Sequence, residues 1–133
     1  MKLRDYKGEE DFKEFTKWWE FWRWKDRVDP QVFPDIGFVI EKDGLNLCAG
    51  WLYVTNSLVA FLGFIVANPY APRKDVDEGL DFLIECLSQR ALKEGKRLVM
   101  TTVNSPSLAK RLGKLGYVES GANLKQFIRL KWE

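Results

Sequence analysis

The sequence predicts an α/β (α+β) protein built on a mixed, mostly antiparallel sheet of six to seven strands, with three to four helices packed on it. Three apolar runs in the middle of the chain, at 36–42, 45–54 and 58–67, are separated by turn residues, which indicates an antiparallel meander. Amphipathic helical patterns flank this meander, and further short strands follow them. The expected element order is β-α-β-β-β-α-β-α-β-β.

The first elements are a short strand at 2–6 and a helix from Glu9 to about Trp24. One face of this helix carries Phe12, Phe15, Trp19 and Trp22, with Trp18 at its edge. Only a strip of the helix needs to face a sheet. Phe21 and Trp24 lie off that strip, so we expect them to pack on the following loop or to be exposed.

Turn residues set the limits of the central strands. Asp43-Gly44 predicts a tight hairpin between the first two. Thr55-Asn56-Ser57 predicts the next turn, and Asn68-Pro69 ends the third strand.

The clearest helix runs from near Asp75 to Gly95, which is a typical C-terminal stop. A strand at Leu98–Val103 follows, of the apolar kind that is buried on both faces. The remaining predicted elements are a helix opened by Ser105-Pro106 and ended by Gly116, and strands at Tyr117–Ser120 and Leu124–Trp132.

Composition restricts the class of protein. A chain of 133 residues suits a single domain over 1–133, and 21 basic against 19 acidic residues make binding to nucleic acid unfavourable. The absence of histidine excludes histidine-based catalysis and histidine metal ligands. The only cysteines, Cys48 and Cys86, are too few for a metal site and are expected as free thiols. With no apolar run long enough to span a membrane and no signal-peptide core, we expect a cytoplasmic protein.

The element order, and a helix that closes on Leu115-Gly116-Tyr117 before two strands, resemble the GNAT superfamily of N-acetyltransferases. More narrowly, the chain resembles small acetyltransferase-like proteins encoded by bacteriophages. The segments that carry the resemblance are Pro34, Gly37, 49–53 (Ala-Gly-Trp-Leu-Tyr), 66–69 (Val-Ala-Asn-Pro), the helix at 75–95, and Asn104.

The resemblance implies acetyl-CoA as cofactor and direct transfer to an amine of a small molecule or a protein. It also implies two splayed central parallel strands, here Leu58–Ala67 and Leu98–Val103, with the pantetheine arm pairing near Val66. The pyrophosphate is expected at the next helix N-terminus, where unpaired amides and the helix dipole favour an anion. The residues predicted to contact the cofactor are Val66, Arg73, Lys74, Asp75, Val76, Asp77, Glu78, Gly79 and Asn104.

The implied phosphate loop, Lys74 to Gly79, departs from the family pattern because it contains three carboxylates. Charge repulsion there opposes phosphate binding. A capping box running from Asp75 to Glu78 explains the same residues without a ligand. Asn104 likewise has an alternative as a helix N-cap, alone or with Ser105.

No catalytic residue can be assigned. Leu112 stands where members of the resembling family often carry a tyrosine acid, and the strand at 58–67 has no carboxylate to act as base. Asp35, Glu41, Tyr53 or a water chain could supply a base. Each of these side chains also has a plain structural explanation.

Four residues are candidates for an acceptor site or an interface: Phe21, Trp24, Phe33 and Tyr53. Aromatic faces favour cations, and tryptophan is enriched at interfaces. Packing within the fold is the competing explanation. A basic stretch at 90–114, with seven lysines and arginines against Glu94, could meet a 3′-phosphate or simply be solvated.

Two functions therefore stay open. One is an acetyl-CoA-dependent N-acetyltransferase. The other is a catalytically degenerate protein of the same fold that acts by protein–protein interaction through the aromatic first helix, for instance a phage protein that binds a host factor in the host cytoplasm. A homodimer is compatible with either function.

Overall fold

The computed structural model describes residues 1–23, 29–125 and 127, and it divides into two compact units, Met1–Thr102 and Val103–Glu133. A single domain over 1–133 stays a prediction. The elements in chain order are β1 (Lys2–Asp5), α1 (Gly8–Phe21), the 3-10 turn η1 (Pro30–Val32), β2 (Ile36–Lys42), β3 (Leu45–Val54), β4 (Val59–Ala67), α2 (Arg73–Lys93), β5 (Leu98–Met100) and α3 (Pro106–Lys114).

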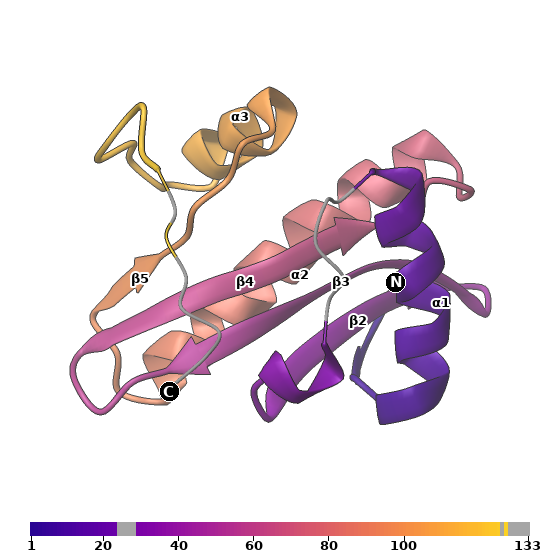
Figure 1. Cartoon of the computed structure of the whole chain (residues 1–133), viewed down its shortest axis with the longest axis horizontal. Helices are drawn as coiled ribbons and strands as arrows, with labels where there is room; N and C mark the ends of the chain where they lie inside the picture. The colour runs from indigo at the N-terminus through magenta and orange to yellow at the C-terminus, as the bar shows by residue number, and fades with distance from the viewer. Residues whose placement is uncertain (24–28, 126, 128–133) are drawn as a thin grey trace. The chain divides into compact units, whose positions relative to one another are not determined.

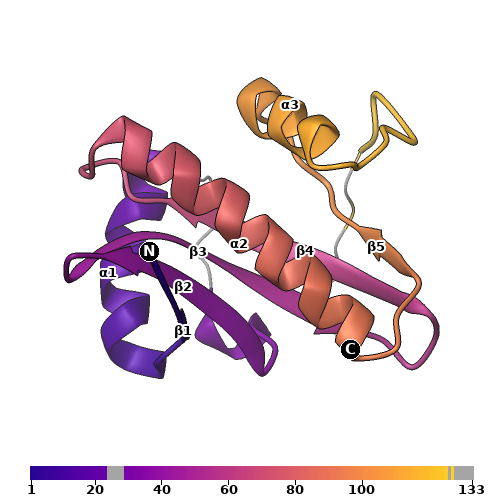
Figure 2. The same cartoon turned by 180° about the vertical axis from the view of Figure 1, so that it is seen from behind.

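The first unit is a five-stranded mixed sheet in the order β1-β2-β3-β4-β5. Neighbouring strands are antiparallel except β4 and β5, which are parallel. Helix α1 covers one face of this sheet (Figure 1) and α2 lies across the other (Figure 2). The predicted mixed, mostly antiparallel sheet with helices is confirmed.

The predicted number of strands is not found among the described residues, which form five strands and three α-helices. Residues 117–120, expected as a strand, have no strand structure. The strand expected at Leu124–Trp132 lies largely outside the described residues. The two parallel strands are also not both central, because β5 is at the edge of the described sheet.

The β2–β3 hairpin has the predicted bounds. Asp43 and Gly44 both have positive φ, 52° and 80°, as the favoured two-residue hairpin turn requires. This turn sets the register that places Trp51 and Ala49 in the core.

The two faces of the sheet have different cores. On the α2 face, the buried residues of the helix are aliphatic and include Leu83, Ile84 and Leu87. The other core is mainly aromatic and is made by Phe15, Trp18, Trp19, Val39, Ala49, Trp51 and Val66, with Tyr6, Phe12, Phe33, Tyr53 and Phe64 packed against it. Within it, Phe33 stacks on Trp51 with ring centroids 4.1 Å apart.

Helix α1 buries Phe15, Trp18 and Trp19, but the prediction that Trp22 faces the core is wrong. Trp22 is the C-cap of the helix and is 46% exposed. Because the helix ends at Phe21, the side chain of Trp22 is no longer held on the buried strip. Phe21 is exposed, as expected for a residue off that strip. Trp24 lies outside the described residues.

The prediction that the strand starting at Leu98 is buried on both faces is also wrong. Leu98 and Met100 are 52% and 43% exposed. The physical reason is position, since β5 lies at the edge of the described sheet and pairs there with β4 alone.

The second unit contains α3. The Ser105 side chain caps the helix by accepting from the Leu108 N–H, whereas Asn104 is exposed and lies before the cap. Gly116 has a φ of +96°, and the Tyr117 N–H bonds to the Leu112 carbonyl, which closes the helix as its glycine predicts. Across the described chain no helix has both the length and the apolar character needed to cross a membrane.

Candidate functional site

The parallel strands β4 and β5 part soon after they begin to pair. Their register covers only three residue pairs, Val59 with Leu98, Ala60 with Val99 and Phe61 with Met100. β5 then ends, while β4 continues to Ala67. Beyond Phe61, β4 has no strand partner on this edge among the described residues. We call the edge from Leu62 to Ala67 the open edge.

Backbone groups on the open edge can be assigned from the pairing on the other side of β4. The Asn68 N–H bonds to the Leu47 carbonyl, which makes Cys48 and Ala67 a non-hydrogen-bonded pair. The N–H and C=O of Ala67 therefore point away from β3, and those of Val66 point toward it. Contact between a ligand and the backbone near Val66 stays a prediction. Of the two residues, it is Ala67 whose backbone N–H and C=O face the open edge.

A β-bulge interrupts β4 within the open edge. Ala49 pairs with Val66 and Trp51 pairs with Gly63, so Phe64 and Ile65 together oppose one residue of β3. Phe64 has a φ of +55°, which is rare for a residue with a side chain. The bulge bends β4 where it no longer has β5 beside it.

The open edge leads directly to the start of α2. Pro72 is the N-cap, and no side chain caps the first turn. The predicted capping box is therefore wrong, because the helix begins at Arg73 and Asp75 already lies inside its first turn. The Asp75 carboxylate is held by Lys42 Nζ at 2.9 Å and so does not turn back onto the helix N-terminus.

Charge at this helix start is more balanced than the sequence suggests. The hydrogen bond from Lys42 to Asp75 raises the pKa of the Lys42 ammonium. Asp77 is 3.4 Å from the Arg73 guanidinium, which is largely exposed. Arg73 and Lys74 thus lie at the helix N-terminus with exposed side chains.

Two other residues of the predicted phosphate loop face inward. Val76 is buried. Gly79 lies in the second turn of α2, where a Cβ atom would come within 3.3 Å of Leu47 and 3.4 Å of Cys48. This geometry favours a packing role for Gly79, and its contact with a cofactor stays a prediction.

Three exposed aromatic residues meet beside this helix start, where α1 ends against the β4–α2 loop. Phe21 contacts Trp22 at 5.0 Å and Tyr70 at 5.6 Å between ring centroids, both edge to face. The indole N–H of Trp22 donates to the Ala67 carbonyl at 2.9 Å. We call Phe21, Trp22 and Tyr70 the aromatic trio.

The candidate bases are not gathered at the open edge. Glu41 pairs with Arg4, and Asp35 is an exposed residue before β2. The Tyr53 hydroxyl donates to the Val32 carbonyl at 2.7 Å, and burial raises the pKa of Tyr53. Tyr53 lies nearest to β4, since a Cβ on Gly63 would be 2.7 Å from its ring.

Comparison with solved structures identifies the architecture. The TTHA1254 protein of Thermus thermophilus is similar over 98% of this chain and 99% of its own, with a TM-score of 0.71 and 16% identity. Glucosamine-6-phosphate N-acetyltransferase of Arabidopsis thaliana has a TM-score of 0.71 and 14% identity over 96% and 98% of the two chains. An aminoglycoside N-acetyltransferase in complex with CoA has a TM-score of 0.66 and 16% identity over 97% and 100%.

The chain has a GNAT-like fold. At the level of sequence, no family model matches the chain and no curated protein matches it. Identities of this size show the fold alone, so the similarity to phage-encoded members stays a prediction.

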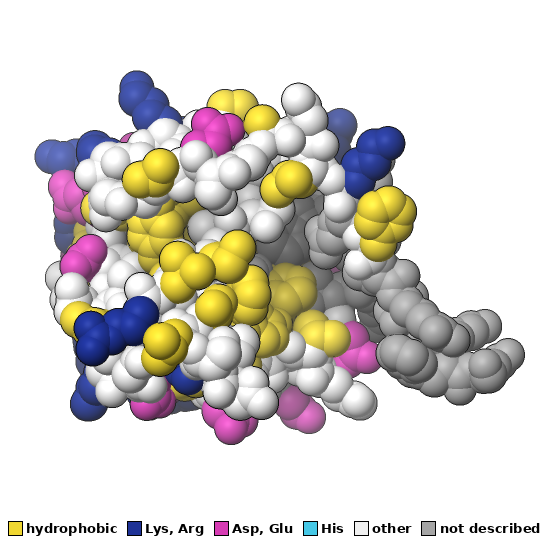
Figure 3. Space-filling model, turned by 90° about the vertical axis from the view of Figure 1, so that its left-hand side faces the viewer, with side chains coloured by type: hydrophobic (Ala, Val, Ile, Leu, Met, Phe, Trp, Pro, Cys, Tyr) yellow, Lys and Arg dark blue, Asp and Glu magenta, His cyan; other side chains and the backbone are white. Residues whose placement is uncertain are grey.

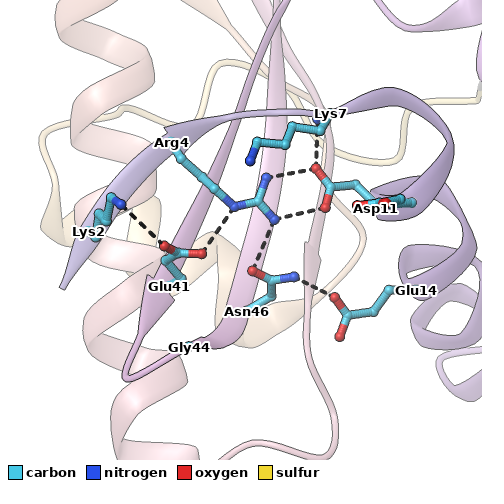
Figure 4. A pocket seen from close by; sticks show the side chains of 9 residues that line it. Lys2, Arg4, Lys7, Asp11, Glu14, Glu41, Gly44 and Asn46 are labelled. Carbon is cyan, nitrogen blue, oxygen red and sulfur yellow. Dashed lines mark hydrogen bonds and ion pairs between the residues drawn. The ribbon is translucent and has the colours of Figure 1, made fainter.

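A cluster of polar side chains surrounds a pocket of about 460 Å³ on the β1 side of the sheet (Figure 4). Arg4 binds both oxygens of buried Asp11 at 2.8 Å and also contacts Glu41 and Asn46. Sequence reasoning missed this cluster because Glu41 and Asn46 are 37 and 42 positions from Arg4 in the chain. Every hydrogen bond drawn there joins protein groups to one another, so the cluster ties β1, α1, β2 and β3 together.

The basic stretch at 90–114 is divided between the two units. In the first unit, Lys96 Nζ donates to the carbonyls of Thr55 and Ser57, and Arg90 pairs with Glu94. These contacts secure the β3–β4 turn and the end of α2.

Among the described residues, no three histidine, cysteine, aspartate or glutamate side chains gather closely enough to hold a metal ion.

Proposed function

We propose that this chain transfers an acetyl group from acetyl-CoA to a primary amine at the point where β4 and β5 part. The observation that supports this most is that pairing stops after Phe61 and Met100, while β4 runs on to the uncapped start of α2. An extended ligand can add to an open strand edge through main-chain hydrogen bonds. The edge from Leu62 to Ala67 spans about 17 Å of strand. The Leu62 carbonyl already accepts from the Thr101 hydroxyl and the Ala67 carbonyl from the Trp22 indole, so a ligand would add to the groups that these bonds leave.

The start of α2 suits the phosphates of the cofactor. Free amides and the helix dipole favour an anion there, and exposed Arg73 and Lys74 add positive charge. Asp75, Asp77 and Glu78 oppose this, but Lys42 joins the two basic residues, so three cations stand against three carboxylates. The acidic residues weaken the phosphate site without reversing its charge.

Bound acetyl-CoA would supply the activated thioester. The amine nitrogen gains the acetyl group and loses a proton, and the CoA sulfur is released and gains one. Along β4 every side chain is apolar, so the proton leaves the amine toward solvent or a side chain outside this strand. Burial raises the pKa of Tyr53, and its hydroxyl already donates to the Val32 carbonyl, so Tyr53 is poorly placed to be that base.

Calorimetric titration with acetyl-CoA tests the proposal. We expect a Kd below about 1 mM for the native chain and an affinity at least tenfold weaker for Lys74→Glu. Lys93→Glu makes the same charge change at the other end of α2 and should leave the affinity within about twofold. Absence of binding at 1 mM, or equal effects of the two variants, would contradict the proposal.

The aromatic trio favours a second candidate function, in which the fold binds another protein without catalysis. Phe21, Trp22 and Tyr70 are 50%, 46% and 70% exposed, and aromatic residues of this kind are enriched at interface hot spots. This function predicts no heat in the acetyl-CoA titration and loss of a purified partner's binding on Tyr70→Ala. It also predicts that Tyr70→Ala leaves the thermal midpoint nearly unchanged.

A further inference from the structure

An uncharged face of the sheet lies next to the point where β4 and β5 part. Residues paired across strands point to the same face, so Tyr53, Phe61 and Met100 share one face, and Val59 and Leu98 share it too. Trp51 lies two residues before Tyr53 and belongs to the aromatic core under α1. The shared face is therefore a continuation of the α1 face.

Helix α1 covers only part of this face. Phe61, Leu98 and Met100 are 41%, 52% and 43% exposed. We call these three residues the apolar patch. Hydrophobic side chains gather on this side of the structure, where β4 begins and β5 lies (Figure 3).

The absence of charged side chains on this face indicates which ligands it can bind. The side chains that the end of β3, the start of β4 and β5 present on it carry no carboxylate and no cation: Trp51, Tyr53, Val59, Phe61, Gly63, Leu98 and Met100. A polycationic ligand on this surface would lose water around each charge without gaining a carboxylate partner. An apolar ligand would gain from covering the same side chains.

Phe61 and Met100 form the last pair before the strands part. A molecule lying on the apolar patch is therefore adjacent to the opening where the proposed acetyl transfer takes place. Among the described residues, no further strand lies between the apolar patch and the open edge.

From these observations we infer that the acceptor is a monoamine carried on an aromatic or branched aliphatic body, which lies on the apolar patch with its amino group toward the open edge. This inference rests on the proposed function. Such an acceptor differs in charge from a polycationic sugar, which this surface would bind poorly. In the transfer, one N–C bond forms, one C–S bond breaks, and the proton lost by the amine balances the proton gained by the thiol.

The test compares three amines in the presence of acetyl-CoA: 2-phenylethylamine, spermidine and kanamycin, with acetylated products quantified by mass spectrometry. We expect a kcat/KM for 2-phenylethylamine at least tenfold above the values for the other two amines. A preference for spermidine or kanamycin would overturn the inference, as would acetyl-CoA binding without acetylation of 2-phenylethylamine.

Variants locate the site. Phe61→Glu should lower kcat/KM for 2-phenylethylamine at least tenfold and leave the acetyl-CoA affinity within about twofold. Leu92→Glu, at an exposed leucine on α2, should change neither value. An unchanged kcat/KM in Phe61→Glu would overturn the placement of the acceptor.

A direct titration with 2-phenylethylamine separates the two proposals. One outcome is that the amine binds the native chain, Phe61→Glu weakens that binding, and acetyl-CoA does not bind. The apolar patch is then confirmed as an amine-binding surface, and the proposed acetyl transfer is wrong. If acetyl-CoA binds and the amine does not, the acceptor inference fails and the cofactor site stands.

Discussion

The indole N–H of Trp22 donates a hydrogen bond to the carbonyl oxygen of Ala67, with 2.9 Å between nitrogen and oxygen. Ala67 is the last residue of β4, and its carbonyl faces the open edge rather than β3. The contact therefore joins the end of α1 to a backbone group that no strand of the described sheet uses. Edge strands are commonly protected in this way against unwanted pairing.

Replacing Trp22 by phenylalanine removes this hydrogen bond and keeps an aromatic ring. We expect the free energy of unfolding to fall by about 0.5–1.5 kcal/mol, toward the lower end because the indole is half exposed. Urea denaturation measures the change. Phe21→Leu, which alters a neighbouring half-exposed ring with no hydrogen bond to lose, is the control, and an equal fall in both variants would contradict the role given to the indole N–H.

The bond between Arg4 and Asp11 predicts a loss of stability in acid. Burial by itself raises the pKa of Asp11, but hydrogen bonds from Arg4 and from the Lys7 N–H, with the charge of Arg4, bring the pKa below its ordinary value. A carboxylate with a lowered folded pKa stabilises the fold above its unfolded pKa of about 3.9 and loses that contribution as pH falls through the folded value.

We therefore expect the native chain to lose stability progressively below about pH 5, as this carboxylate takes up a proton. Asp11→Asn should be less stable than the native chain at pH 7. Its thermal midpoint should also fall less steeply as the pH is lowered. Glu9→Gln, in the same turn of α1 but exposed, should keep the native slope. Parallel acid limbs for the native chain and Asp11→Asn would contradict the assignment.

Gly63 allows the Tyr53 ring to lie close to β4. A Cβ atom at this position would be 2.7 Å from the ring, so Gly63→Ala must displace Tyr53 and strain its hydrogen bond to Val32. We expect a loss of about 1–3 kcal/mol in the free energy of unfolding. In a Tyr53→Ala background the same substitution should cost much less, and an additive double variant would show that the ring is not the obstacle.

Asp75 offers a way to strengthen the proposed phosphate site. Asp75→Asn removes a carboxylate from the first turn of α2 and leaves Lys42 without its partner, so positive charge near the helix start rises. We expect acetyl-CoA to bind about three- to tenfold more tightly at low salt, and the gain should shrink at about 0.5 M salt because of screening.

Glu85→Gln is the matched control for that variant. It removes one exposed carboxylate from the middle of α2, away from the helix N-terminus. Its acetyl-CoA affinity should stay within about twofold of the native value. A weaker affinity in Asp75→Asn would mean that the Lys42–Asp75 pair orders the site rather than opposing it.

The sequence indicated the helix start at which the candidate site lies, but not the side-chain contacts around it. Arg73 and Lys74 were expected at a helix start after a strand, and they lie there. The expected capping role of Asp75 was wrong, because its carboxylate binds Lys42, 33 positions away, and local pattern carries no information about such a partner. The contact of Trp22 with Ala67 was missed for the same reason.

By itself the sequence determined the features whose causes are local. Asp43-Gly44 suits one tight turn, so the bounds of β2 and β3 and the faces of their side chains followed from a few neighbouring residues. Tertiary structure alone decided how far β4 and β5 stay paired and which backbone groups remain on the open edge. Strand pairing depends on the free energy of contacts between segments some forty residues apart, and that free energy is set by the whole packed sheet.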